Sequence, residues 1–428
     1  MRQSLRARRG VRARYRAWGA AHRDADRPLL WVHAPSVGEG LQARPVLELA
    51  RAERPDVQRV YTYYSPSAGG LARTLVAGGL AEHADVLPFD TRGDADALLD
   101  ALRPTALVFS KLDVWPTLVA RAAARGVRLG LVSATLAPGA GRRGRVATAL
   151  LRDAYCALDR VGAIDAADAE RLVALGVRRD RVEVTGDTRY DQVWRRAHAS
   201  ALAPDAAAAL AALAGARLGI QLGSESPAAG GRRFTVVAGS TWPADEGPLG
   251  EAWAALRRQD ARARLVLAPH EPTPAHLAPL ERWAAAERLR VTRWSALLDA
   301  PGAASDADVV LVDRVGVLAD LYAAADAAFV GGGFHAAGLH SVLEPAAFGV
   351  PVAFGPRHAN SRDAGLLLAA GGGASAPTGR SLAELLLRWR TSDALRAREG
   401  AAARRAVEDG LGADRRTWAL VAALLGDG

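Results

Sequence analysis

Short apolar runs alternate with helical patterns along most of the chain, and the alternation occurs twice. In the first half, runs such as "LLWVH", "ALVFSK" and "RLGLVSA" are each followed by apolar residues at helical spacing. Strands that alternate with helices in this way form βαβ units and a parallel sheet. The rhythm restarts at "FTVVAGS" and continues to "VPVAFGP". The sequence therefore predicts an α/β protein with two doubly wound, Rossmann-like domains.

The length of the chain supports the same division. Its 428 residues exceed what one hydrophobic core usually supports. A stretch rich in Gly, Ser and Pro, "LGSESPAAGGRR", is the best candidate for a linker. We expect the two domains to face each other across a cleft between the carboxyl edges of their sheets, where a two-substrate enzyme would work. The predicted segments are a basic arm (1–28), a first domain (29–195), a linker region (196–233) and a second domain with the C-terminal helices (234–428).

The formal charge of +9 is concentrated at the N-terminus. The first 21 residues, "MRQSLRARRGVRARYRAWGAA", are rich in arginine, and no acidic residue precedes Asp24. Such an arm, with Tyr15 and Trp18 among its arginines, suits an anionic surface. Because no helix-turn-helix, RNA-recognition or zinc-finger pattern accompanies it, we expect no nucleic-acid partner. A membrane surface and a merely solvated helix both remain open. No uncharged apolar run approaches the roughly 20 residues that a spanning helix needs.

Lysine and cysteine each occur only once, and both are informative. Lys111, in "VFSKLDVWP", is the single lysine of a chain full of arginine. A compact ammonium group is not interchangeable with guanidinium at a tight site, although chance retention explains it equally well. The single cysteine, Cys156, excludes internal disulfides and any site with several cysteine ligands. We expect it to be a reduced, part-buried thiol.

A carboxylate stands at the first strand-to-helix turn, in "HAPSVGEG". Ser36 and Glu39 fit the S-x-x-E capping box, in which each side chain satisfies a backbone amide of the other. The turn also follows a strand of an open α/β sheet, where such folds bind ligands. Both interpretations, a cap and a substrate-facing carboxylate, fit the residues.

Four loops of the second domain follow predicted strands and meet at one edge. The strand "AAFVGGG" leads to a helix that we expect to begin near Ser341, and glycines with a helix N-terminus are suited to phosphate. Glu344 either caps that helix with Ser341 or accepts hydrogen bonds from ribose hydroxyls. "AGSTWPADE", "VLAPHEP" and "VDRVGVL" supply the other three loops. Together the loops predict a nucleotide site.

Six motifs in order resemble one family. "HAPSVGEG", "FSKLDVWP", "VTGDTRYD", "AGSTWPADE", "APHEP" and "GGGFHAAGLHSVLEPAAFGVPVAFGP" are similar to those of the bacterial 3-deoxy-D-manno-octulosonic acid (Kdo) transferases, GT-B-fold glycosyltransferases of lipid A assembly. The resemblance runs from about residue 29 to residue 372. It implies that Glu39 is the catalytic base. It also implies that Pro269, His270, the turn at 315–317 and residues 341–344 hold a cytidine nucleotide.

The resemblance further implies an inverting transfer of Kdo from CMP-Kdo to a lipid A precursor in lipopolysaccharide core assembly. Glu39 would take a proton from an acceptor hydroxyl, which attacks the anomeric carbon as CMP leaves. Helix N-termini with His270 or Lys111 would stabilise the leaving monophosphate, so we expect no metal and no cofactor. Lys111 would alternatively bind the Kdo carboxylate. We expect a peripheral protein on the cytoplasmic face of the inner membrane.

The predicted site residues fall into three groups. Beside the catalytic Glu39, one group touches the acceptor or stabilises charge, and the other binds the nucleotide. The acceptor or charge-stabilising group is Ser36, Gly38, Lys111 and Asp113. The nucleotide-binding group is Ser240, Thr241, Pro269, His270, Val315, Gly316, Val317, Gly332, Gly333, His340, Ser341, Val342, Leu343 and Glu344.

The chain also departs from the family's pattern. Many members have E-T-E-L-W-P where this chain has Lys111 and Asp113, R-H-P where it has "HEP", and G-H-N where it has His340 and Ser341. Members commonly start with an apolar membrane anchor. Attachment here is expected to depend on the basic arm, unless the start is placed late.

Three other interpretations remain. The chain is a GT-B enzyme that uses another nucleotide sugar, a Rossmann dehydrogenase, or a non-catalytic protein that binds lipid A or an anionic membrane. The dehydrogenase is disfavoured because "GGGF" lacks a G-x-G-x-x-G after a first strand.

Overall fold

The computed structural model describes residues 2–137, 145–198, 204–214, 233–301 and 306–426. Within them the chain forms two compact units, and each unit contains a parallel sheet of seven strands. The first unit comprises residues 1–192 and 410–428, and the second comprises residues 193–409. The predicted fold class, α/β with two doubly wound sheets, is confirmed.

The first sheet has the strand order β3-β2-β1-β4-β5-β6-β7. Its strands are β1 (Leu29–His33), β2 (Gln58–Tyr63), β3 (His83–Val86), β4 (Ala106–Ser110), β5 (Arg128–Ala134), β6 (Arg160–Ala163) and β7 (Val182–Val184). The helices of this unit are α1 (Arg2–Ala7), α2 (Val11–His22), α3 (Val37–Glu53), α4 (Gly69–Ala77), α5 (Arg92–Leu102), α6 (Pro116–Ala123), α7 (Arg145–Cys156), α8 (Ala166–Leu175) and α20 (Ala413–Leu425).

The second sheet has the order β10-β11-β9-β8-β12-β13-β14. Its strands are β8 (Thr235–Thr241), β9 (Arg264–Pro269), β10 (Val291–Arg293), β11 (Val309–Leu311), β12 (Ala327–Val330), β13 (Val352–Phe354) and β14 (Gly373–Ser375). Its helices are α10 (Pro204–Ala214), α12 (Pro243–Gln259), α13 (Pro274–Ala286), α14 (Trp294–Asp299), α15 (Leu318–Leu321), α16 (Leu343–Ala347), α17 (Arg362–Ala370), α18 (Gly379–Thr391) and α19 (Asp393–Glu408).

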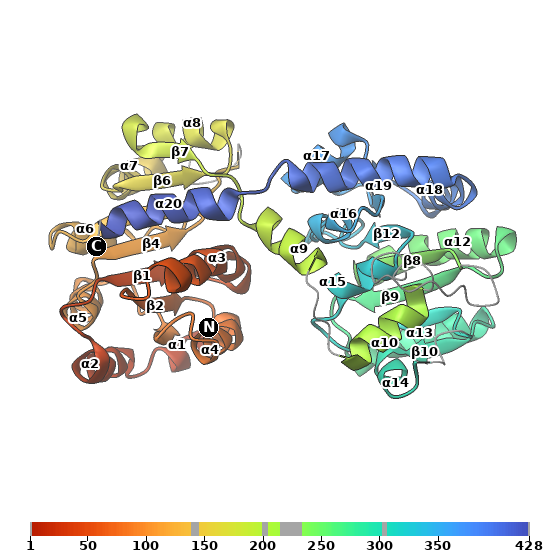
Figure 1. Ribbon diagram of the computed structural model, residues 1–428, viewed down its shortest axis with the longest axis horizontal. Helices are drawn as coiled ribbons and strands as arrows, with labels where there is room; N and C mark the ends of the chain where they lie inside the picture. The colour runs from red at the N-terminus through yellow and green to blue at the C-terminus, as the bar shows by residue number, and fades with distance from the viewer. Residues whose placement is uncertain (1, 138–144, 199–203, 215–232, 302–305, 427–428) are drawn as a thin grey trace. The chain divides into compact units, whose positions relative to one another are not determined.

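Both faces of each sheet are covered by helices (Figure 1). In β1, Leu29 and Trp31 join one hydrophobic cluster while Leu30 and Val32 join another, because successive side chains point to opposite faces. The cluster of Leu29 includes residues of α2, α5 and α6, and that of Leu30 includes residues of α3, α4 and α20. Strands buried on both faces read as continuous apolar runs, which is why the sequence revealed them.

The division of the chain differs from the predicted one. The chain passes between the units within α9 (Arg189–Ala197) and returns after α19. Helix α20, predicted for the second domain, packs Trp418 and Val421 into the core of the first unit. Helix α10, predicted as linker, buries Leu210 in the second unit. The linker residues 199–203 and 215–232 lie outside the described residues.

The basic N-terminal segment is not a free arm. Tyr15 is completely buried, and Trp18 stacks on His83 with ring centroids 5.1 Å apart. Arg12 and Arg14 form ion pairs with Asp94 and Asp85. Helix α2 is therefore part of the first unit, and two of its arginines form ion pairs within that unit. In the described residues we find no helix with the length and apolar character that crossing a bilayer requires. Cys156 is exposed, not part-buried as expected.

Asp191 stabilises the return of the chain to the first unit. One carboxylate oxygen accepts a hydrogen bond from the Gly412 amide at 2.7 Å, and the other accepts one from the Asp414 amide at 3.0 Å. Gly412 has the left-handed φ of 79° and directly precedes α20. The Asp191 carboxylate thus satisfies amides that the start of α20 leaves without partners.

Replacing Asp191 by Ala should make α20 open more easily. Loss of such a cap costs about 1–2 kcal/mol, which corresponds to an amide exchange rate roughly tenfold higher. Hydrogen exchange followed by mass spectrometry over residues 413–425 measures this rate. Asp180→Ala is the control, because Asp180 forms only an exposed pair with Arg178. Unchanged exchange in Asp191→Ala would show that packing alone holds α20.

Candidate functional site

The predicted catalytic carboxylate lies where the order of the first sheet reverses. β1 and β4 are neighbours, and their connections run to opposite sides of the sheet. Glu39 follows β1, and Lys111 directly follows β4. Open α/β sheets bind ligands at such a switch point, outside the carboxyl ends of the strands. The two residues therefore occupy the position in this unit that best suits a ligand.

Glu39 does not take part in a capping box. Ser36 is the N-cap residue of α3, but its side chain makes no cap hydrogen bond. The Glu39 carboxylate instead forms an ion pair with Lys111, with Oε1 3.5 Å from Nζ. Its side chain is 18% exposed, so it is accessible yet partly shielded. Burial, and then the charge of Glu39, raise the pKa of Tyr61 above its ordinary range. Gly38 is exposed on the first turn of the same helix.

Lys111 has a strained backbone. Its φ of 64° lies in the left-handed region, which non-glycine residues rarely adopt. The Lys111 amide donates to the carbonyl of Val132 at 2.9 Å, so the neighbouring strand holds this conformation. Such strain is concentrated at functional sites. The single lysine of the chain is thus fixed beside Glu39.

Behind these residues runs a buried polar chain in which only Asp113 was predicted. The Asp113 carboxylate accepts hydrogen bonds from Trp115 Nε1 at 3.0 Å and from His33 Nε2 at 3.2 Å. On the other side of its ring, His33 Nδ1 lies 2.9 Å from the hydroxyl of Thr62, which accepts from Trp31 Nε1. His33 is completely buried. The chain fixes Asp113 and so the loop that carries Lys111.

In the second unit the sheet order reverses between β8 and β12. Ser240, with a left-handed φ of 54°, and the buried Thr241 end β8. The three glycines 331–333 follow β12. Gly332 has a φ of 92°, and a side chain on Gly333 would come within 2.4 Å of the backbone of Gly355. Only glycine fits these two positions, and both are buried.

Asp245 joins these two segments. Its carboxylate is completely buried at the start of α12 and accepts a hydrogen bond from the Trp242 amide at 2.9 Å. It also accepts from the amides of Gly332 at 2.8 Å and Phe334 at 2.9 Å. The sequence placed Asp245 in the first turn of this helix without predicting this role. Its spacing of three residues from Trp242 was the available signal.

Aromatic rings stack beside this junction. Trp242 lies 4.4 Å from His335 and 4.7 Å from His270 between ring centroids, and His270 lies 4.4 Å from His340. Trp242 Nε1 donates to His340 Nε2 at 3.0 Å. Burial, followed by the nearby His270, lowers the pKa of His340 to about 4. His270 and His340 were predicted, and the structure brings them together. Sequence reasoning missed Trp242 and His335.

The turn predicted to hold the nucleotide is fixed by Arg196, which the sequence did not indicate. Arg196 binds Asp320 through two hydrogen bonds of 3.0 and 3.1 Å and donates to the carbonyl of Gly316 at 2.8 Å. Gly316 has a φ of 90°. Val315 is 76% exposed, and Val317 begins α15 as its N-cap. The exposed valine and the fixed turn form a surface that a ligand can reach.

Glu344 lies near this ion pair. Burial raises its pKa, the charge of Arg196 opposes that shift, and Asp320 adds to it. The predicted capping box is absent, because α16 begins at Leu343 with Val342 as N-cap and no side-chain cap. Ser341 is exposed in the preceding loop.

Besides Thr241, three predicted nucleotide residues have buried side chains. Pro269, Val342 and Leu343 belong to β9 or to the start of α16, and their side chains are inside the unit. Any contact that they make with a ligand is therefore through the backbone.

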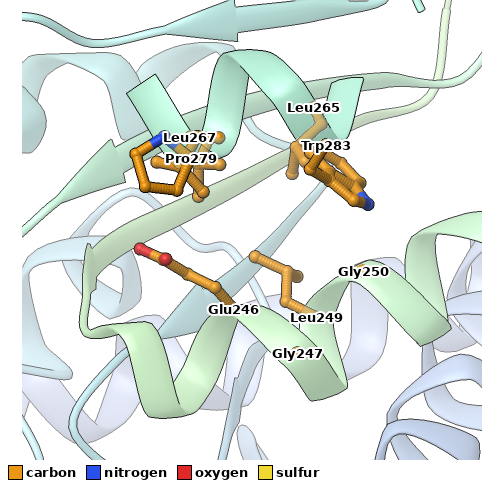
Figure 2. Close-up of a pocket in the computed structure, with 9 residues that line it drawn as sticks. Glu246, Gly247, Leu249, Gly250, Leu265, Leu267, Pro279 and Trp283 are labelled. Carbon is orange, nitrogen blue, oxygen red and sulfur yellow. The ribbon is translucent and has the colours of Figure 1, made fainter. Parts of the chain in front are cut away.

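A cavity of about 200 Å³ lies between α12 and α13, apart from the predicted positions (Figure 2). Leu249, Pro279 and Trp283 line it, and Glu246 stands at one end. The Glu246 carboxylate already binds the Thr241 hydroxyl at 3.1 Å and His276 Nε2 at 2.7 Å. In the described part of the chain, no group of three or more His, Cys, Asp or Glu side chains has the arrangement of a metal site.

Comparisons with known proteins identify the family. The family described as "3-Deoxy-D-manno-octulosonic-acid transferase (kdotransferase)" matches residues 4–192. A 3-deoxy-D-manno-octulosonic acid transferase of Bordetella pertussis is 31% identical over 409 residues, covering 94% of this chain and 89% of the relative. The enzyme of the same name from Chlamydophila psittaci is 29% identical and covers 81% and 74%.

The solved structures show the fold. UDP-GlcNAc 2-epimerase from Neisseria meningitidis, bound to UDP-GlcNAc, has a TM-score of 0.61 at 14% identity, covering 94% of this chain and 100% of that one. The two Rossmann-like units are thus those of a GT-B fold. With the family match in sequence, the chain belongs to the 3-deoxy-D-manno-octulosonic acid transferases and is a Kdo-transferring glycosyltransferase.

Proposed function

We propose that this enzyme transfers Kdo from CMP-Kdo to a lipid A precursor, with inversion at the anomeric carbon, during assembly of the lipopolysaccharide core. The observation that carries the proposal is the Glu39 carboxylate, held beside Lys111 at the switch point of the first sheet. In a Kdo transferase, a partly shielded carboxylate at this position suits a general base.

Glu39 accepts the proton of an acceptor hydroxyl in the proposed reaction. The hydroxyl oxygen forms a bond to the anomeric carbon of Kdo, and the bond from that carbon to the phosphate oxygen of CMP breaks. Its electron pair leaves with CMP. Lys111 keeps a positive charge 3.5 Å from Glu39 Oε1 and holds the carboxylate at this end of the sheet. In an alternative role, the Lys111 ammonium binds the carboxylate of Kdo.

The nucleotide is proposed to bind at the switch point of the second sheet. The imidazoles of His270 and His340 and the turn around Gly316, with its exposed Val315, offer hydrogen-bond donors and a reachable surface. Because the leaving group is a monophosphate, such donors are sufficient to stabilise its charge, and we propose that the reaction needs no divalent ion.

The acceptor is a lipid, and we propose that the enzyme works peripherally at the cytoplasmic face of the inner membrane. Arg12 and Arg14 are used in ion pairs, but Arg6 on α1, Arg9 in the turn after it and Arg16 on α2 are exposed. These three arginines are suited to bind phosphates of an anionic surface.

Assays with defined donors test the proposed function. The purified enzyme, with a lipid A precursor and with chelator present, should consume CMP-Kdo and leave UDP-sugars intact, and mass spectrometry should find Kdo on the precursor. Consumption of a UDP-sugar instead would identify another GT-B activity. No release of CMP, with retained binding of lipid A, would identify a binding protein.

Glu39→Gln should lower kcat by about 10²-fold or more, because the amide cannot accept the proton. The steady-state rate of CMP release measures this loss. Glu48→Gln is the matched control, since Glu48 lies on the same helix and forms an i,i+4 ion pair with Arg44. Near-normal turnover in a folded Glu39→Gln variant would exclude Glu39 as the base.

Glu344→Gln should weaken CMP binding by about tenfold, because a carboxylate that accepts hydrogen bonds from ribose hydroxyls is replaced by a neutral amide. Titration calorimetry measures the Kd. The thermal midpoint should change little, since no cap is lost. Glu384→Gln, at an exposed ion pair on α18, should leave CMP affinity unchanged. Equal affinity of the Glu344 variant and the wild type would show that Glu344 only balances Arg196.

Replacing Arg6, Arg9 and Arg16 together by Gln should weaken binding to anionic vesicles. Each basic residue near such a surface contributes about 1 kcal/mol, so the affinity should fall by about two orders of magnitude. Cosedimentation at low salt measures the affinity, and high salt should release the wild type, since the Debye length falls to about 3 Å at 1 M. Truncation is a poorer test, because it would remove the buried Tyr15.

The control for charge is a second triple variant with the same net charge, Arg282, Arg380 and Arg398 to Gln, on exposed positions of the second unit. It should bind vesicles like the wild type. Both triple variants should use a detergent-dispersed acceptor normally. Binding that persists at 1 M salt would show that apolar groups hold the membrane, and that the electrostatic explanation is wrong.

A further inference from the structure

The Trp242–His340 hydrogen bond restricts where His340 can carry a proton. The two ring planes are within 12° of each other, and Trp242 Nε1 lies 3.0 Å from His340 Nε2. Because the two rings are nearly parallel, the N–H can point along the lone pair of Nε2, which lies in the imidazole plane. An indole nitrogen is only a donor, so Nε2 must be the unprotonated acceptor. A neutral His340 in this pair carries its hydrogen on Nδ1.

The surroundings of His340 keep the ring neutral. Burial lowers its pKa to about 4, and the neighbouring His270 and His335 also disfavour a second positive charge. Asp245 opposes this effect, but its carboxylate is shared among three backbone amides. The groups that face the ring come from the end of β9, from the glycine loop and from α12. The N–H of Nδ1 is therefore present over the whole physiological pH range.

Nδ1 of His340 is available to a ligand. Among the residues that the structure describes, none forms a hydrogen bond with this nitrogen, and the ring is partly exposed. His340 stands between the glycine loop and the exposed Ser341, and its amide donates to the carbonyl of Gly331 at 3.1 Å. The ring cannot turn freely, because His270 stacks on it at 4.4 Å and Trp242 holds its opposite nitrogen. A fixed donor at such a site is a preorganised electrostatic group.

We infer that His340 acts as a neutral Nδ1–H donor to a phosphate oxygen of the departing nucleotide, and that Trp242 is the positioning residue that selects this tautomer. The identity of the ligand rests on the proposed function, whereas the tautomer does not. As the bond from the anomeric carbon to the phosphate oxygen breaks, its electron pair stays with the phosphate, and the Nδ1–H bond to the phosphate strengthens. No proton is transferred. A neutral imidazole can serve as such an electrophile.

The first experiment needs no substrate. The full chain is labelled with ¹⁵N-histidine, and His340 is assigned by the signal lost in His340→Gln. Its Nδ1 should be protonated and its Nε2 unprotonated from about pH 5 to 8. In Trp242→Phe, which keeps an aromatic ring in the stack, both tautomers should be present and the imidazole should titrate at higher pH. A wild-type His340 that is charged at pH 7, or that carries its hydrogen on Nε2, would overturn the inference.

The second experiment adds CMP. The Nδ1 signal of His340 should shift when CMP binds, and Trp242→Phe should lose the shift at pH 8. If CMP binds by calorimetry without moving this signal, His340 is not its partner. If CMP does not bind at all, the proposed function is wrong and CMP is not the ligand of His340. The first experiment still decides which tautomer His340 adopts.

Turnover measurements distinguish the proposed roles of His340 and Trp242 from merely structural ones. His340→Gln should lower kcat by about 10²-fold, and His340→Asn, which keeps an N–H near the Nδ1 position, should recover part of the rate. Trp242→Phe should lose activity several-fold at pH 8. Relative to the wild type it should regain activity at low pH, because a protonated imidazole again has hydrogen on Nδ1. If the ratio of the Trp242→Phe rate to the wild-type rate is constant across pH, Trp242 contributes only packing.

Discussion

The buried carboxylate of Asp245 is the interaction on which the second site depends. It binds the amides of Trp242, Gly332 and Phe334, and so joins the end of β8 to the loop after β12. Hydrogen bonds to a charged group contribute about 1.5–3 kcal/mol each, and a buried carboxylate left without them would be costly. The junction fixes the backbone at Trp242, whose indole ring in turn donates to His340. The switch point of the second sheet is thus held by a group that itself is inaccessible to any ligand.

In the first unit, too, a network of hydrogen bonds supports the accessible groups at the switch point, but different residues form it. Behind Glu39 and Lys111 lies the chain of hydrogen bonds from Trp31 through Thr62 and His33 to Asp113. This chain supports the loop in which Lys111 keeps its left-handed backbone. In both units a buried polar network fixes the groups that remain accessible at a switch point. Networks that are fully satisfied add rigidity, and rigidity is what a site for two substrates requires.

Much of the fold follows from local patterns, because strands buried on both faces leave continuous apolar runs. The strands β10 and β14 were missed, since each has three residues and lies at a sheet edge with little apolar content. The domain boundaries were misplaced because α20 joins the first core through contacts with residues hundreds of positions away, which no local pattern records. Glu39, His270 and His340 were found from motifs at strand ends. Trp242 and Arg196 were not, because a stacking ring and a turn-binding guanidinium have no fixed spacing from the residues that they hold.

The excess of arginine also acquires a physical explanation. Arg14 binds Asp85 with two donors, and Arg196 holds Asp320 and the Gly316 carbonyl together. A planar guanidinium with several donors suits such bridging between segments. The net charge of +9 therefore overstates the positive surface that the protein offers to a partner. Beside Glu39, in contrast, stands the only lysine, and Lys111 there has a left-handed backbone. Arginine side chains thus hold segments of this enzyme together, and the single ammonium group lies at the proposed reaction centre.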